Sequence, residues 1–343
     1  TPAATPPSTA PAAAEVPLRD RPLPERIAAT TPTVPTPSSQ TDGTITVSAV
    51  VCTIDGAPFT GDDAFTTIGP IAWSSDGALY LSDNDGKVRR YTVQAGDACA
   101  LTMDTTFGAN GLLAVGDGMS ARVESIVADA QGHVFVATSM RGTTRITGTH
   151  VDYQCDTRGR LSVSPDGTTG VAVFGSGPAQ LVTFTDAGCT TAPFEMAEAF
   201  QRIEGTAFLE NDRILVGGQN DVRDPHLVRV YDRRGRAQGA VFGDQTGEMN
   251  HDDHFCYVHG ATPCGAGICV HDGNCRTLRV FGADHAVLGA PNVMRLIGLS
   301  YPWVPSTTGV RDGVAYLTAS QQRGTASERT GVYDGYVFRL NGL

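Results

Sequence analysis

Short apolar segments recur along the chain, separated by polar stretches. The third residues of successive segments lie 55, 37, 43, 54 and 47 positions apart. A repeat of roughly 40–50 residues is typical of β-propeller blades, each of which is a small antiparallel sheet. The six segments occupy residues 78–81, 133–136, 170–173, 213–216, 267–270 and 314–317. The pattern predicts six similar units.

The stretches around these segments carry strand and turn signals. Residues 227–231 (Leu-Val-Arg-Val-Tyr) and 277–281 (Thr-Leu-Arg-Val-Phe) alternate apolar and basic side chains, as a strand with one wet face does. Asp-Gly or Gln-Gly pairs precede several segments and favour tight turns, because glycine adopts positive φ without strain. Helical periodicity is nowhere sustained, so the fold class is all-β.

The last repeat reaches the C-terminus without a fourth strand of its own. Residues 45–51 (Ile-Thr-Val-Ser-Ala-Val-Val) form an unassigned strand at the other end of the chain. We expect this strand to lie beside residues 336–340 and to close the ring, which would remove exposed sheet edges. The prediction is a six-bladed β-propeller over residues 41–343, closed by an N-terminal strand.

One stretch resembles a known repeat family. Residues 88–91 read Val-Arg-Arg-Tyr, residues 103–111 read Met-Asp-Thr-Thr-Phe-Gly-Ala-Asn-Gly, and residues 126–136 supply the next two strands. This order is similar to the delta-sixty type of bacterial propeller repeat over roughly residues 70–140, and the other blades are similar in general to NHL-like propellers. The resemblance implies a propeller in an extracytoplasmic setting, and it brings no catalytic residues with it.

Composition separates the first 40 residues from the rest. They are dominated by Pro, Thr, Ala and Ser, a composition that favours an extended tether or a strap over a packed fold. The chain starts at Thr1, and we expect a mature form whose export signal has been removed. No apolar run approaches the roughly 20 residues that span a bilayer. The formal net charge of −11 disfavours nucleic acid as a partner.

The chain has eight cysteines, an even number that fits disulfides formed in an oxidising compartment. Four of them fall in a Cys-rich insertion predicted at about residues 250–275, where their spacing differs from that of usual zinc sites. The disulfide candidates are Cys52, Cys99, Cys155, Cys189, Cys256, Cys264, Cys269 and Cys275. The sequence leaves their pairing open.

The same insertion is rich in histidine and aspartate. His251, Asp253, His254 and His259 could bind a transition metal, or a His–Asp pair among them could act as a general base. The simpler interpretation is that they are solvent-exposed side chains of a polar segment pinned by disulfides. The preferred interpretation is that no cofactor is needed, with a structural Ca²⁺ or transition metal as the alternative.

Two acidic residues fall on predicted inner strands, where a propeller presents side chains to its central channel. Glu124 and Glu204 are these channel candidates, and sugar-lactonase-like propellers hold Ca²⁺ in that place with Glu, Asn and Asp. Salt-bridged or solvated acids are the simpler interpretation. Tyr301, Trp303 and Tyr333 are candidate partner-binding aromatics, because aromatic side chains often anchor partners.

No complete catalytic set is recognisable, so the sequence assigns no catalytic residue. The leading hypothesis is a secreted or periplasmic, non-enzymatic propeller that serves as a protein-interaction or scaffold subunit of an envelope or extracellular assembly. The first alternative is a propeller enzyme of the lactonase, lyase or quinone-dehydrogenase kind, with Ca²⁺ or a cofactor in the channel. The second is a glycan-binding module that uses the exposed aromatics.

Overall fold

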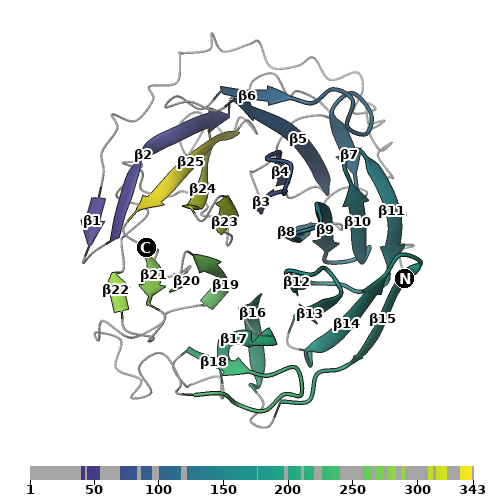
Figure 1. The fold of residues 1–343 in the computed structure, drawn as a ribbon, viewed down its shortest axis with the longest axis vertical. Coiled ribbons are helices and arrows are strands. Elements are labelled where there is room, and N and C mark those ends of the chain that lie inside the picture. Colours follow the sequence, from purple (N-terminus) through teal and green to yellow (C-terminus); the bar gives the residue numbers. More distant parts are fainter. Residues whose placement is uncertain are drawn as a thin grey trace, which may run out of the picture. The chain divides into compact units, whose positions relative to one another are not determined.

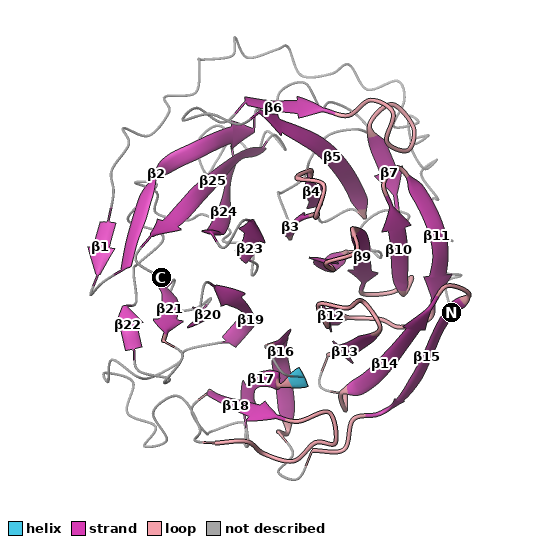
Figure 2. Cartoon of the chain, viewed as in Figure 1, coloured by secondary structure: helices cyan, strands magenta, loops and turns pink. Residues whose placement is uncertain are grey.

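The computed structural model divides the chain into two units, Thr1–Thr36 and Pro37–Leu343. The predicted Pro-rich tail lies outside the described residues except for Gln40. The structure describes residues 40–42, 45–54, 70–82, 86–94, 100–116, 122–175, 177–196, 200–209, 212–219, 226–239, 258–264, 267–272, 277–282, 287–289, 308–311, 314–322 and 333–341. Figure 2 shows these residues almost wholly as strands and loops.

Within those residues, the strands form six antiparallel sheets. The sheet that holds both ends of the second unit runs in the order β1 (Gln40–Asp42), β2 (Ile45–Ile54), β25 (Tyr333–Asn341), β24 (Val314–Gln322) and β23 (Thr308–Arg311). The next contains β3 (Ile71–Trp73), β4 (Leu79–Ser82), β5 (Lys87–Gln94), β6 (Ala100–Met103) and β7 (Leu112–Ala114), which also pairs with β5.

The other four sheets follow the chain in order. They contain β8 (Val123–Ala128), β9 (His133–Thr138), β10 (Thr143–Thr147) and β11 (His150–Cys155); then β12 (Arg160–Val163), β13 (Thr169–Val173), β14 (Gln180–Thr185) and β15 (Gly188–Pro193); then β16 (Arg202–Phe208), β17 (Ile214–Gln219) and β18 (Leu227–Tyr231); then β19 (Val258–Cys264), β20 (Gly267–Asp272), β21 (Thr277–Phe281) and β22 (Val287–Gly289).

The strands β3, β8, β12, β16, β19 and β23 are the inner strands of the six sheets. Each contacts the inner strand of the sheet on either side, and β23 contacts β3, so the contacts form a closed cycle. Figure 1 shows these strands nearest the middle of the unit, with later strands of each sheet farther out. Small antiparallel sheets that repeat around an axis in this way define a β-propeller.

The predicted closure is confirmed. Strand β2 pairs with β25, with Val47 opposite Leu340 and Thr53 opposite Tyr336. The first strand after the tail therefore completes the sheet formed by the last residues of the chain. This pairing protects two edges that would otherwise be open to other chains.

The core lies between neighbouring sheets, which explains the unbroken apolar segments. Side chains alternate between the two faces of a strand. In β9, Val134 and Val136 pack toward the β3 sheet, whereas Phe135 packs toward the β12 sheet. Phe135 meets Phe184 of that sheet with ring centroids 4.6 Å apart. A middle strand buried on both faces needs apolar residues at every position.

The Phe-Gly motif at residues 107–111 has a structural role. Phe107 is fully buried, and its ring meets Tyr80 edge to face at 5.7 Å. Gly108 has φ +57°, and a Cβ there would lie 2.2 Å from the carbonyl oxygen of Leu112. Only glycine tolerates this positive φ together with so close a backbone contact.

A disulfide joins two neighbouring sheets at their outer strands. Cys155 ends β11 and is bonded to Cys189 of β15, 34 positions later in the chain. Cys269 in β20 is also disulfide-bonded. Cys52 lies in β2 and Cys264 in β19, while Cys99, Cys256 and Cys275 lie outside the described residues. The prediction of disulfides is confirmed for the residues that the structure describes as bonded.

Part of the range predicted as a Cys-rich insertion forms two strands of the ring. Strands β19 and β20 are the first two strands of a sheet, so they belong to the ring and do not interrupt it. Val258, Ile268 and Val270 are buried against the β16 sheet. Residues 267–270 of β20 are one of the six predicted apolar segments, so the repeat pattern extends into this range.

Candidate functional site

Three inner strands share an irregularity at the same place. In β8, β16 and β19 one extra residue interrupts the pairing with the next strand, between Val123 and Ser125, Ile203 and Gly205, and Val258 and Gly260. The bulged residues are Glu124, Glu204 and His259. The two predicted channel acids and one predicted metal ligand thus occupy equivalent backbone positions. Bulges re-aim a side chain and are frequent beside functional sites.

Glu204 is the most enclosed of the described acids on these strands. Its side chain is 1% exposed, with Nδ1 of His226 2.7 Å from Oε2 and Nε of Arg202 3.3 Å from Oε1. His226 is itself buried and directly precedes β18. Among the described residues, none donates a well-directed hydrogen bond to either Glu204 oxygen. Charge attraction therefore dominates the contacts of this carboxylate.

Glu124 sits between two arginines. Nε of Arg122 lies 3.8 Å from Oε1, and Nε of Arg160 lies 3.9 Å from Oε2. At these distances the charged groups form ion pairs but no hydrogen bonds. Arg160, the first residue of β12, also donates a hydrogen bond to the backbone oxygen of Glu204. Arg160 therefore links the acidic positions of β8 and β16.

The result is a network of alternating charge across three adjacent inner strands. A cation entering beside Glu124 or Glu204 would meet guanidinium groups that already contact those carboxylates. Buried charges need partners of this kind to offset the loss of hydration. No group of three His, Cys, Asp or Glu residues suited to a metal occurs in the part of the chain that the structure describes.

The arginines and His226 were not predicted as site residues. A sequence signal for two of them exists, because residues 122–124 read Arg-Val-Glu and residues 202–204 read Arg-Ile-Glu. This Arg-apolar-Glu pattern places an arginine two positions before each bulged acid. Arg160 and His226 have no such signal, since they reach the acids from other strands.

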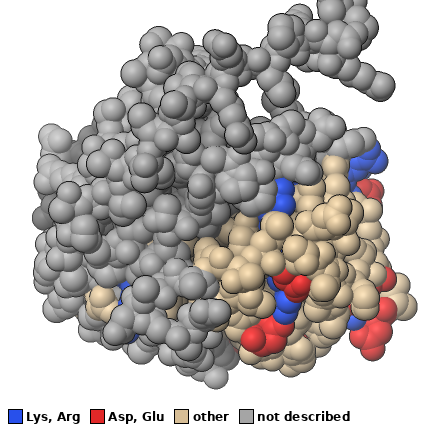
Figure 3. Space-filling view, turned by 90° about the horizontal axis from the view of Figure 1, so that it is seen from above, with Lys and Arg blue, Asp and Glu red and all other residues tan. Residues whose placement is uncertain are grey.

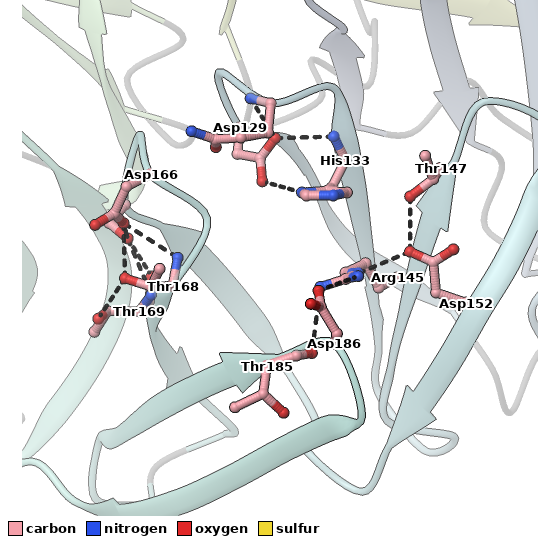
Figure 4. Close-up of polar contacts among 12 residues, drawn as sticks. Asp129, His133, Arg145, Thr147, Asp152, Asp166, Thr168, Thr169, Thr185 and Asp186 are labelled. Atoms are coloured by element: carbon pink, nitrogen blue, oxygen red, sulfur yellow. Dashed lines mark hydrogen bonds and ion pairs between the residues drawn. The ribbon is translucent and has the colours of Figure 1, made fainter.

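A second set of polar contacts stabilises the turn between β8 and β9 and the turn between β12 and β13. Oδ1 of Asp129 accepts the N–H groups of Gln131 and His133, and Oδ2 lies 2.6 Å from Nδ1 of His133 (Figure 4). In the next sheet, Asp166 accepts hydrogen bonds from the Ser164 hydroxyl and from the N–H and hydroxyl of Thr168. The Ser164 bond foremost lowers the pKa of the Asp166 carboxyl.

A third cluster lies farther out in the β8 sheet. Arg145 pairs with Asp152, at 2.8 Å between Nε and Oδ2, and reaches Asp186 of the next sheet at 3.3 Å (Figure 4). The hydrogen bond to Asp152 raises the pKa of Arg145, although burial by itself would lower it. The Thr147 hydroxyl and Arg145 in turn lower the pKa of Asp152. On the face seen in Figure 3, basic and acidic side chains of described residues lie next to one another.

The remaining predicted site residues are only partly covered. Tyr333 begins β25, and His259 lies in β19. His251, Asp253, His254, Tyr301 and Trp303 lie outside the described residues. Metal binding by the histidines and partner or glycan binding by the aromatics stay predictions. No helix of the described residues is long and apolar enough to cross a membrane.

Comparisons with known proteins support the fold. Neither known family models nor curated protein sequences match the chain. A gluconolactonase from Xanthomonas campestris is similar in structure, with a TM-score of 0.50 and 13% identity over 89% of this chain and 95% of that one. A chain of the nidogen/laminin complex has a TM-score of 0.48 and 12% identity, covering 76% of this chain and 94% of its own. At such identities the gluconolactonase likeness shows the propeller fold alone.

Proposed function

We propose that this chain is a six-bladed propeller that serves as a non-enzymatic protein-interaction or scaffold subunit of an exported assembly. One observation carries the proposal. Glu124 and Glu204, the inner-strand acids that an enzyme of this fold would use, are engaged by Arg122, Arg160 and Arg202 of the chain itself. A ring whose inner acids are already paired within the chain is suited to presenting its surface to partners.

Two further features support the setting. The Cys155–Cys189 bond and the bonded Cys269 fit a secreted or periplasmic protein, because disulfides persist in oxidising compartments. The six sheets of the described residues support the blade count, and the buried Phe107 with Gly108 supports a delta-sixty or NHL-like repeat.

The test is capture of the partner in its native setting. The tagged full-length chain is cross-linked in its own envelope fraction, purified and sized, and the captured protein is then used to recover this chain in return. We expect reciprocal capture and co-elution at a fixed ratio. A chain that elutes as a lone monomer and recovers nothing would overturn the proposal.

A propeller enzyme of the lactonase kind is the second candidate. It is favoured by the equivalent bulges at Glu124, Glu204 and His259 and by the fold likeness to the gluconolactonase. The assay is hydrolysis of gluconolactone with added Ca²⁺, alongside metal analysis of dialysed native protein. Turnover lost in Glu204→Gln, together with a retained stoichiometric metal, would replace the leading proposal by this one.

A further inference from the structure

Four exposed arginines and two exposed apolar side chains gather where the inner strands begin. Arg122, Arg158 and Arg202 have side chains 47%, 42% and 49% exposed, and Arg141 is also exposed. Met140 and Phe174 are each 50% exposed. We call these six residues the arginine surface.

Backbone contacts bring three of the segments together. The N–H of Ser139 donates to the carbonyl of Arg122, which places Met140 and Arg141 beside the start of β8. The N–H of Gly159 donates to the carbonyl of Thr138, so the segment that carries Arg158 lies along the same turn.

Two more contacts extend the surface to the following strands. Gly159 packs so closely on the backbone of Phe174 that a Cβ would lie 2.8 Å from the Phe174 Cα. Arg160 next to it bonds the carbonyl of Glu204, two residues after Arg202. The segments that carry the six side chains are thus neighbours on three adjacent sheets.

The described residues of this region include more basic than acidic groups, whereas the whole chain carries a negative formal charge. Its arginines face Glu124, Glu204 and the exposed Asp156, which pairs with Arg158 at 2.9 Å. Counted with Arg160, basic groups outnumber these acids in a chain of formal net charge −11. A local positive region on an acidic protein attracts and orients an anionic partner.

The exposed Met140 and Phe174 indicate that the anionic partner also carries apolar groups. Methionine, aromatic residues and arginine are enriched where proteins meet, and methionine adapts its shape to varied partners. A small anion could use the guanidinium groups but would leave both apolar side chains in water. A polypeptide that alternates carboxylates with apolar side chains would use both.

We propose that the arginine surface binds an acidic segment of a partner polypeptide that also carries apolar side chains. This inference rests on the proposed function and names the chemistry of the partner. Guanidinium groups would pair with the carboxylates of the segment, and Met140 and Phe174 would cover its apolar side chains. The attraction weakens as salt screens exposed charges.

The test uses a fluorescent peptide of repeated Glu-Glu-Leu-Ser units and the full-length chain, read by anisotropy at low salt. We expect saturable binding that is weakened about tenfold in the double variant Arg122→Glu/Arg158→Glu, because charge reversal makes both contacts repulsive. The double variant Arg234→Glu/Arg236→Glu is the matched control, since it changes the net charge equally at exposed arginines in another turn. Thermal unfolding verifies that both variants remain folded.

Several outcomes would overturn the inference: no binding of the peptide, equal weakening by the two double variants, equal binding of a peptide with Gln in place of Glu, or tighter binding of a single-stranded oligonucleotide. Reciprocal capture of a native partner without binding of the acidic peptide would overturn this inference alone. Failure of that capture would count against the proposed function.

Discussion

Glu204 of the inner strands and Asp129 of the turns are alike in two respects. Their side chains are 1% and 0% exposed, and each has a histidine Nδ1 close by, at 2.7 Å for His226 and 2.6 Å for His133. They differ in what else they contact. Asp129 accepts two backbone N–H groups from its own turn, whereas Glu204 is contacted by the side chains of Arg202, in its own strand, and of His226, next to β18.

The difference shows that burial alone does not define the role of a carboxylate. Asp129 satisfies backbone donors within four residues of itself, so it closes a turn wherever that turn is formed. Glu204 depends on Arg202 and on His226, which arrives only when the third strand of the sheet is in place. The contacts of Glu204 therefore form only in the assembled sheet. The following substitutions compare the contributions of the two carboxylates to stability.

The largest effect is expected from Glu204→Ala. Removing the buried carboxylate breaks its contacts with His226 and Arg202, at a cost of about 3–5 kcal/mol in the free energy of unfolding. Urea denaturation of the full-length chain measures the change. Glu124→Ala is the matched control, since Glu124 is bulged in the same way but 19% exposed and held by longer ion pairs; its cost should be about 1 kcal/mol or less. Equal losses for the two variants would contradict the contrast.

A smaller loss is expected from Gly167→Ala, which tests how firmly Asp129 is held. A Cβ on Gly167 would lie 2.0 Å from Oδ2 of Asp129, and φ is +69°. Because Asp129 is fixed by its three donors, it cannot move away, and we expect a cost of about 3 kcal/mol from positive φ and overpacking together.

Gly175→Ala separates the cost of positive φ from the cost of overpacking. Gly175 has φ +57°, and an added Cβ there would meet no atom beyond its chain neighbours within 4 Å, so only the backbone term of about 1 kcal/mol applies. Denaturation curves of the two alanine variants, measured in parallel, give the difference. If both variants lost the same stability, Asp129 would have to move away from the added Cβ at position 167 at no cost.

The closed ring could be predicted from sequence because it rests on a short-range pattern. The apolar segments whose side chains the structure describes are mostly buried between sheets, and the unassigned strand β2 had one open partner, β25. The placement of Glu124 and Glu204 on inner strands followed from the same repeat.

The charge network could not be predicted, because it depends on register. A bulge adds one residue without any change in composition, so nothing in the sequence marks Glu204 as displaced from the ladder. Arg160 lies 44 positions from the carbonyl that it binds, and their proximity is set by how β12 packs against β16.

The smallest effect concerns Asp166, a turn carboxylate like Asp129 but in the next sheet. The hydroxyl of Ser164 and the N–H of Thr168 stabilise its charged form and lower its pKa in the folded state. A carboxyl with a lowered folded pKa stabilises the fold above its unfolded pKa of about 3.9, and this contribution is lost as the pH falls through the folded pKa. Ser164→Ala should raise the pKa of Asp166 toward the unfolded value and flatten the acid limb of stability. An NMR titration of the Asp166 carboxyl carbon measures the shift, and Asp166→Asn, which removes the titrating group, is the control. An unchanged midpoint in Ser164→Ala would mean that the Ser164 hydroxyl does not lower the pKa of Asp166.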